Sequence, residues 1–239
     1  NTPCPGEIHG DTTVRDTINS EVTVLDPPYT KCEGCGEEAL PTFDVSAYIT
    51  VAQSVPPLIG DQEIDDLGNR LGPRKIDGDL SINDSNSNGD CELTITGPLY
   101  ITGKLNVDNC NIYLDPSYGP AGEVVIVEEA ISFRPGANIY KTSQDGYLLF
   151  SSLSTDGIGI KGGDESTKQA IFHNLEDTIV LDNLYPSTTI EGAVIGQSIE
   201  VRATFAFQFI QGINLSNSIP ISPLSSSWRI IRGTYKIGQ

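Results

Sequence analysis

One short pattern recurs along this chain of 239 residues. It places glycine two residues after an isoleucine and leucine two residues after the glycine, and it begins at Ile76, Ile95 and Ile101. A related pattern begins at Ile190. Apolar side chains at alternate positions are typical of a strand with one buried face, and repetition of one strand-plus-glycine unit is typical of stacked coils. We therefore predict an all-β fold, a right-handed parallel β-helix (solenoid).

Two spacings suggest the length of one coil. Ile76 and Ile95 are 19 residues apart, and so are Cys91 and Cys110. If 19 residues make one coil, the two cysteines lie above one another on adjacent coils and can form a disulfide.

From Lys75 onward the sequence is almost continuously that of short strands separated by turns. The run VVIV at 124–127 is apolar throughout, which is typical of a strand covered on both faces. The 24 glycines and 15 prolines also fit many short strands. We expect the solenoid to occupy 75–239, with the segment around Trp228 as the cap of its open end.

The preceding residues differ from the rest. Residues 1–43 are expected to form strands and a cysteine-rich loop, and 44–74 a short helical insertion. Asp44 can cap one helix that runs to about Val55, and Asp61 can cap a second, in which Ile64, Leu67 and Leu71 form an apolar stripe.

The charge and the cysteines restrict the setting. A formal net charge of −18 repels phosphate backbones and anionic lipid, so nucleic-acid binding is disfavoured. No apolar run approaches the roughly 20 residues needed to span a bilayer. Five cysteines in an acidic, glycine-rich chain favour an oxidising, extracellular location. Because the chain starts at Asn1 and has no methionine, we expect that a leader or anchor preceded it.

One loop has the pattern of a calcium site. Oxygen-bearing side chains alternate along it, and a glycine stands at the sixth position, as in a calcium-binding loop. The twelfth position, where a glutamate is required, is Ile95. The alternative is a polar loop whose side chains cap their own backbone. The sequence does not require a cofactor. The candidate ligands of a calcium ion are Asp84, Asn86, Asn88, Asp90 and Glu92.

The other three cysteines lie near the N-terminus. Cys32 and Cys35 are separated by two residues, and Cys4 lies upstream with His9. In an extracellular chain we expect a disulfide from Cys4 to Cys32 or Cys35, which leaves one cysteine free or paired outside the chain. A zinc site of three thiolates and His9 is the alternative.

An enzymatic alternative rests on the segment TDGIGIKGGDES. Parallel β-helix enzymes that cleave acidic polysaccharides carry acidic residues on the outside of their coils, and this segment supplies Asp156, Lys161, Asp164 and Glu165. The other elements of the polygalacturonase type are missing. His173 alternates with apolar residues and is expected to be an outward polar residue of a strand.

The sequence resembles a group of pilus-associated bacterial surface proteins of the minor-pilin (PilX-like) kind. The similar stretches are PPLIGDQEI from Pro56, IDGDLSI, GPLYITGKLNV and NIYLDPSYGPAGEVVIVEEAISF, and a tryptophan segment near the end. The resemblance covers 56–133 and, loosely, the remainder. The family's hydrophobic N-terminal helix is missing, and the later coils are less regular than the family's Ser-Asn-Asn repeats. The resemblance implies a β-solenoid ectodomain with a structural or adhesive role outside the cell.

We therefore expect a non-catalytic structural or adhesion module at the cell surface. Its expected partners are other pilus or surface proteins, with host or surface glycans as further candidates. A self-assembling subunit of an extracellular filament is one alternative, and a polysaccharide-cleaving enzyme is the other.

Overall fold

The computed structural model describes residues 43–64, 69–84, 91–163, 166–182 and 188–202, and the backbone of six further strands. The chain divides into two compact units, 1–42 with 223–235 and 43–222 with 236–239. In the first unit β1 (Gly6–His9) pairs in parallel with β3 (Val22–Leu25), and β2 (Thr12–Val14) with β4 (Lys31–Glu33). The remaining two of these strands are β21 (Ala206–Phe209) and β22 (Tyr235–Ile237).

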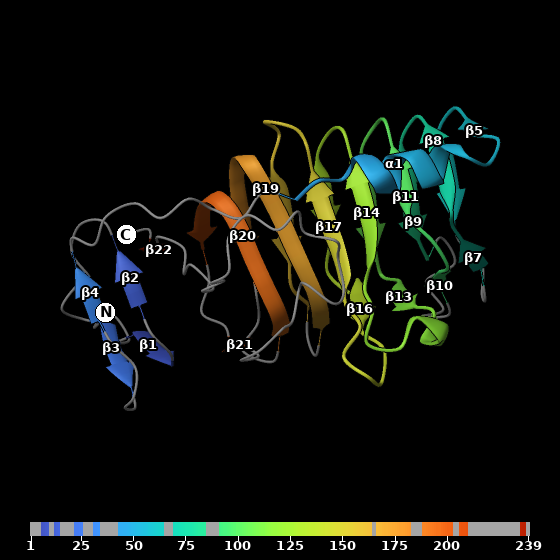
Figure 1. Cartoon of the computed structure of the whole chain (residues 1–239). Coiled ribbons are helices and arrows are strands. Elements are labelled where there is room, and N and C mark those ends of the chain that lie inside the picture. The colour runs from blue at the N-terminus through green and yellow to red at the C-terminus, as the bar shows by residue number, and fades with distance from the viewer. Residues whose placement is uncertain are drawn as a thin grey trace. The chain divides into compact units, whose positions relative to one another are not determined.

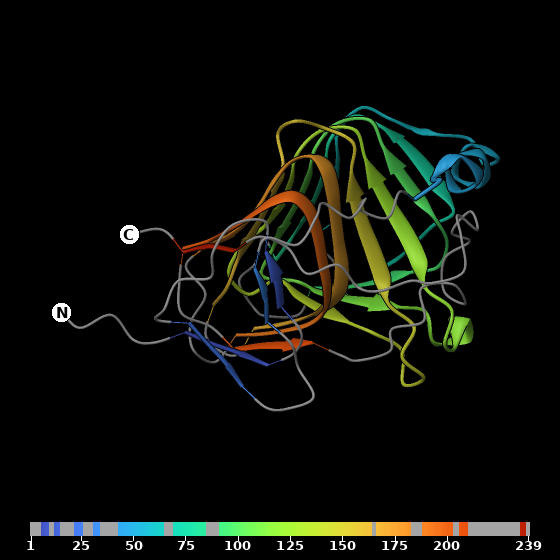
Figure 2. The ribbon, with the colours of Figure 1, turned by 60° about the vertical axis from the view of Figure 1, so that its left-hand side comes forward.

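The second unit contains a parallel β-solenoid, as predicted (Figure 1). Each coil has three short strands, and equivalent strands of successive coils pair in parallel. The strands therefore form three faces that wind around one interior (Figure 2). Face A contains β5 (Leu58–Ile59), β8 (Arg74–Asp77), β11 (Leu99–Ile101), β14 (Glu123–Val127) and β17 (Leu148–Ser152). Face B contains β6 (Gln62–Ile64), β9 (Leu80–Asn83), β12 (Leu105–Asp108), β15 (Ile131–Phe133) and β18 (Ile158–Lys161). Face C contains β7 (Asn69–Leu71), β10 (Glu92–Ile95), β13 (Asn111–Leu114) and β16 (Asn138–Tyr140).

Two long strands complete the described coils. β19 (Thr167–Asp182) pairs with β16, β17 and β18 in turn, so this one strand serves all three faces. β20 (Thr189–Val201) follows β19 in parallel with one irregularity in the register. β21 pairs with the start of β20. The predicted cap around Trp228 lies outside the described residues.

The prediction that Ile76 and Ile95 lie one coil apart is wrong. Ile76 pairs with Ile101, and Ile95 pairs with Leu71 and Leu114. The recurring pattern marks corners of the solenoid, and more than one kind of corner carries it. Corner glycines pack tightly between coils, since a Cβ on Gly72 would lie 2.3 Å from the carbonyl oxygen of Gly97. Glycine therefore identifies a corner but not which corner it is.

The predicted bond between Cys91 and Cys110 is confirmed. The two residues form a disulfide with their Cα atoms 4.7 Å apart. They precede β10 and β13, which pair in register on face C, so the bond joins consecutive coils. The spacing of 19 residues holds for β10 and β13 but not for the rest of face C, because Leu71 and Ile95 are 24 residues apart and Ile112 and Ile139 are 27 apart.

The interior holds continuous rows of aliphatic side chains, and an aromatic cluster fills its later coils. The ring of Phe133 lies 5.0 Å from that of Phe150 and 5.4 Å from that of Phe172, in edge-to-face geometry. All three side chains are fully buried. Burial of side chains of this size stabilises the fold by about 1.5–3 kcal/mol each.

Of the two predicted helices, the first is confirmed, but its N-cap residue is Val45 and not the predicted Asp44. α1 (Ser46–Gln53) follows Asp44, whose carboxylate accepts a hydrogen bond of 3.0 Å from the backbone N–H of Ser46. α1 lies against β8 and β11 of face A (Figure 1). Residues before and within the helix pack on an apolar cluster on the outside of face A, which contains Val124, Ile126, Leu149 and Ile171. This cover explains why both faces of the run VVIV are apolar.

The second predicted helix is wrong. Residues 62–64 form β6 and residues 69–71 form β7, which are the face B and face C strands of the first coil. Ile64 pairs with Ile82, and Leu71 pairs with Ile95. The apolar spacing that fits a helix also fits two strands with an intervening corner, and the next coil supplies strand partners that a helix would leave unpaired. Leu67 lies outside the described residues.

A lysine lies within the interior rows of the described coils. Lys168 is fully buried between Ile139 and Ile190 of neighbouring coils, and its Nζ donates to the carbonyl oxygen of Ala137. Burial lowers the pKa of Lys168 to about 8, because a low-dielectric interior disfavours the charged form. Lys168 therefore destabilises the fold at neutral pH.

We predict that Lys168→Met is more stable than the native protein by about 1–2 kcal/mol at pH 7, after the lost hydrogen bond to Ala137 is subtracted. Between pH 8 and 10.5 unfolded lysine binds a proton that folded Lys168 does not, so this residue makes the native protein more stable as the pH rises. The advantage of the variant should therefore shrink across that range. Urea unfolding at several pH values measures it, and a variant that is less stable at pH 7 contradicts the prediction.

Candidate binding face

The outside of face B carries polar side chains in two rows. Strand alternation points Leu80 and Ile82 inward, so Ser81 and Asn83 point outward. The register of the parallel coils then places equivalent side chains above one another. From β9 to β18 the first row contains Ser81, Asn106, Ser132 and Gly159, with Glu63 before them and Val180 after them. The second row contains Asn83, Asp108, Arg134, Lys161 and Asp182.

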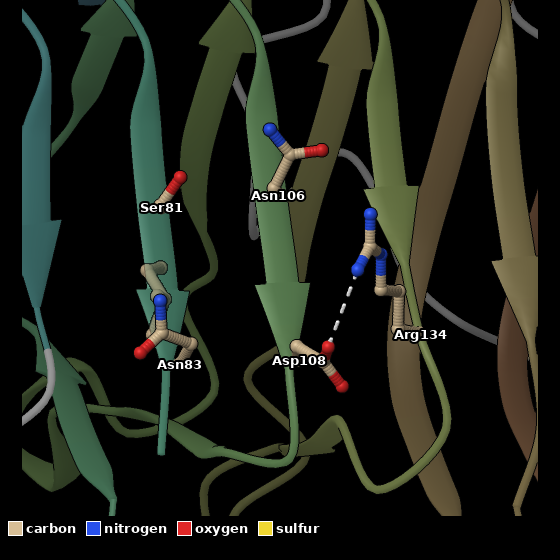
Figure 3. Close-up of a pocket in the computed structure, with 6 residues that line it drawn as sticks. Ser81, Asn83, Asn106, Asp108 and Arg134 are labelled. Carbon is tan, nitrogen blue, oxygen red and sulfur yellow. Dashed lines mark ion pairs between the residues drawn. The ribbon is translucent and has the colours of Figure 1, made fainter. Parts of the chain in front are cut away.

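A hollow of about 190 Å³ opens between these rows (Figure 3). Its lining comes from β9, from β12 and from the residue that follows β15, so three successive coils contribute (Figure 3). The side chain of Ile82 belongs to the interior, which leaves polar groups to face the hollow. The lining residues are Ser81, Ile82, Asn83, Asn106, Asp108 and Arg134.

The charged groups of the hollow balance one another. A guanidinium nitrogen of Arg134 lies 3.5 Å from Oδ2 of Asp108, and both side chains are substantially exposed, at 60% and 43% (Figure 3). An exposed pair at this distance contributes little to stability. Both groups are therefore available to a ligand at small cost.

One neighbouring group orients a side chain of the lining, and others flank the hollow. Nδ2 of Asn83 donates to Oε1 of Glu63 over 3.0 Å, which orients the amide, and its buried Oδ1 has no hydrogen-bond partner. Lys161 and Asp182 continue the charged row as a pair 4.0 Å apart. The carboxylate of Glu63 and the Lys161–Asp182 pair therefore flank the hollow.

The lining of the hollow offers several hydrogen-bond donors and acceptors. Asp108 is the one carboxylate in the lining, and Arg134 neutralises it. General acid–base cleavage of a glycosidic bond requires two carboxyl groups that flank the bond. The lining thus offers amides, a hydroxyl, a carboxylate and a guanidinium as hydrogen-bonding groups to a ligand.

A second polar cluster lies near the start of face A and is internally paired. Nζ of Lys141 contacts Asp145 at 2.7 Å and also Glu191, whose other oxygen accepts from Gln169 at 2.7 Å. Tyr147 donates to Glu191 at 3.1 Å. Since these groups satisfy one another across several coils, the cluster ties the coils together.

The predicted calcium residues are only partly described. Asp84 accepts a hydrogen bond of 3.3 Å from Nδ2 of Asn109, and Glu92 is exposed at the start of β10. Asn86, Asn88 and Asp90 lie outside the described residues. Within the described part of the chain, no group of three or more His, Cys, Asp or Glu residues is placed to hold a metal ion. Calcium binding by this loop stays a prediction.

The N-terminal cysteines are also largely outside the description. Cys4 and Cys35 are not among the described residues. Cys32 lies in β4 rather than in a loop, because its backbone pairs with Thr13 of β2. The disulfide and zinc alternatives for these cysteines both stay predictions.

The residues of the enzymatic alternative do not gather at one described site. Asp156 is exposed in the turn before β18, and Lys161 ends that strand beside Asp182. Asp164 and Glu165 lie outside the described residues. His173 points outward from face A as expected, yet it is only 5% exposed because Phe43 packs against its ring at 4.5 Å.

Sequence reasoning missed Asn106, Asp108 and Arg134. Asn106 stands between the apolar residues Leu105 and Val107, but only the alignment of one coil on the next places it beside Ser81. Arg134 follows β15 and precedes Pro135 and Gly136, a sequence typical of a turn, so its type and position alone do not indicate a binding residue.

In the described part of the chain, no helix is both long enough and apolar enough to cross a bilayer. Compared with protein-family models, with curated proteins and with solved structures, the chain matches none of them.

Proposed function

We propose that this chain is a non-catalytic structural and adhesion module that acts outside the cell, on a pilus or another part of the cell surface. The observation that carries the proposal is the outer surface of face B, where successive coils present polar side chains in register. A repeated surface of this kind suits an extended partner, which can contact several coils at once.

The stiffness of the coils supports a mechanical role. The interior rows are packed with fully buried aliphatic and aromatic side chains, and strand pairing connects each described coil to the next. Load applied at one coil is therefore carried by many backbone hydrogen bonds. The disulfide between Cys91 and Cys110 adds a covalent link between coils and favours an oxidising compartment.

Fractionation of cells that produce the full-length protein tests the location. We expect the protein in the surface or extracellular fraction with Cys91 and Cys110 oxidised. A reduced, cytosolic protein would contradict the proposal. The purified chain should also release no reducing ends from a panel of neutral and acidic polysaccharides, and release from any of them would favour the enzymatic alternative.

The first coil favours a second candidate, the filament subunit. The inward residues of this coil, Leu58, Ile64 and Leu71, pack on the core but stay partly exposed, and Ile59 is 72% exposed. Exposed apolar groups on terminal strands invite pairing with another chain. End-on stacking of a second copy would cover them.

Sedimentation velocity over a range of concentrations measures this stacking. If the first coil mediates it, the native protein forms larger species at high concentration, and Ile59→Lys lowers the association constant by about tenfold or more. Leu153→Lys is the matched control, because Leu153 is exposed elsewhere at 41% and its replacement should leave association unchanged. A native protein that stays monomeric rules out this candidate.

A further inference from the structure

We infer that the hollow on face B binds one unit of an uncharged glycan whose chain continues along the row of small side chains. This inference rests on the proposed adhesive function and names the ligand class of its binding face. Four features of the described residues support it: size, balance of charge, kinds of hydrogen-bonding group and the geometry of the neighbouring coils.

The size of the hollow fits part of a polymer. Its volume is about 190 Å³, whereas pockets that enclose a whole drug-sized ligand hold about 300–1,000 Å³. A single sugar ring is a unit of suitable size. Most of such a ligand would then lie on the open surface beside the hollow.

The charge of the hollow favours a neutral ligand. Asp108 and Arg134 cancel one another, so the lining offers no net attraction to an anion or a cation. The chain as a whole carries a formal charge of −18, which repels acidic polysaccharides and nucleic acids at long range. An uncharged partner needs no net charge in the lining and is not repelled by the negative charge of the chain.

The hydrogen-bonding groups match the chemistry of sugar hydroxyls. A carboxylate accepts two hydrogen bonds, a guanidinium donates several in a plane, and an amide does both. Neighbouring hydroxyls on a sugar ring are both donors and acceptors at fixed spacing. Asp108, Arg134 and Asn106 therefore provide complementary partners, and bonds to the two charged groups are the strong ones.

The geometry of the neighbouring coils allows the ligand to continue. Asn106 pairs with Ser132, and Ser132 with Gly159, so small side chains follow the hollow from coil to coil. A Cβ placed on Gly159 would meet nothing closer than 4.0 Å, which shows that the space outside this residue is open. Paired charges border the row at Lys104–Glu129 on one side and Lys161–Asp182 on the other. Parallel coils repeat every 4.7–4.9 Å or so, a spacing similar to the length of one sugar unit.

Affinity electrophoresis of the purified chain tests the inference. The probes are three uncharged polysaccharides, laminarin, galactomannan and dextran, with polygalacturonate as the acidic comparison. We expect at least one uncharged probe to retard the native protein. Asn106→Trp should then weaken binding by at least about tenfold by filling the hollow, and Asp108→Ala should weaken it by about tenfold through lost charge-assisted hydrogen bonds.

Thr94→Trp is the matched control. Thr94 points outward on face C and pairs with Arg70 and Tyr113 of the adjacent coils, so a tryptophan there adds the same bulk on a different face. Its binding should equal that of the native protein. Circular dichroism and urea unfolding of all three variants separate loss of binding from loss of folding.

Three results would overturn the inference: no retardation by any uncharged probe, equal retardation of Asn106→Trp, or binding to polygalacturonate alone. A surface-located protein that binds none of the uncharged probes would refute this inference and leave the adhesive function standing. A cytosolic protein would refute the adhesive function itself, whatever its affinity for glycans.

Discussion

Phe150→Ala is expected to lower the free energy of unfolding by about 3–5 kcal/mol, as large-to-small substitutions of buried aromatic residues do. Phe150 packs against the rings of Phe133 and Phe172, at centroid distances of 5.0 and 6.0 Å. Its loss leaves a cavity in the interior that the stacked strands on either side are too constrained to close. Urea denaturation followed by circular dichroism measures the change.

Leu153→Ala is the control for this substitution. Leu153 follows β17 and is 41% exposed, so we expect a change within about 0.5 kcal/mol. Equal losses for the two variants would mean that the aromatic cluster does not form the interior of the solenoid.

Acidification from pH 6.5 to pH 4 is expected to remove about 3 kcal/mol of stability through His173 alone. Burial lowers the pKa of His173 to about 4. Its Nδ1 lies 3.0 Å from the Ser151 hydroxyl, while its Nε2 is buried without a hydrogen-bond partner. In this pH range the unfolded histidine binds a proton that the folded one does not. The stabilisation is complete above pH 6.5 and is lost as the pH falls toward 4.

His173→Leu isolates this effect. The variant lacks the titrating ring but keeps His9, the other histidine of the chain, so the two proteins differ in one titrating group. Between pH 6.5 and 4 the native protein should lose about 3 kcal/mol more stability than the variant does. Parallel pH profiles for the two proteins would refute a buried, neutral His173.

Much of the fold could be predicted from local pattern. Alternating apolar residues predicted the strands of the central coils, and the apolar run at 124–127 predicted a strand covered on both faces. The cysteine pair at 91 and 110 identified neighbouring coils because a disulfide requires close Cα atoms. These features depend on residues near one another in sequence or on a covalent constraint.

The alignment of the coils could not be predicted from the same patterns. The glycine pattern occurs at different corners, so equal spacing did not mean equal position. The apolar residues at 64 and 71 fit a helix until the next coil is present as a strand partner. The hollow depends most strongly on this alignment, because it combines Ser81, Asn106 and Arg134 from three coils. No local motif joins those residues.

The candidate binding face requires that outward side chains of successive coils lie directly above one another. Cysteines placed at Asn111 and Asn138 test it, since these residues pair in register on face C and their amides are hydrogen-bonded at 3.0 Å. We predict that Asn111→Cys with Asn138→Cys forms a disulfide under mild oxidation, mapped by mass spectrometry of unreduced peptides, whereas Asn106→Cys with Asn138→Cys, on two different faces, does not. Failure of the first pair to bond, or equal bonding of both pairs, would contradict the stacking on which the binding face depends.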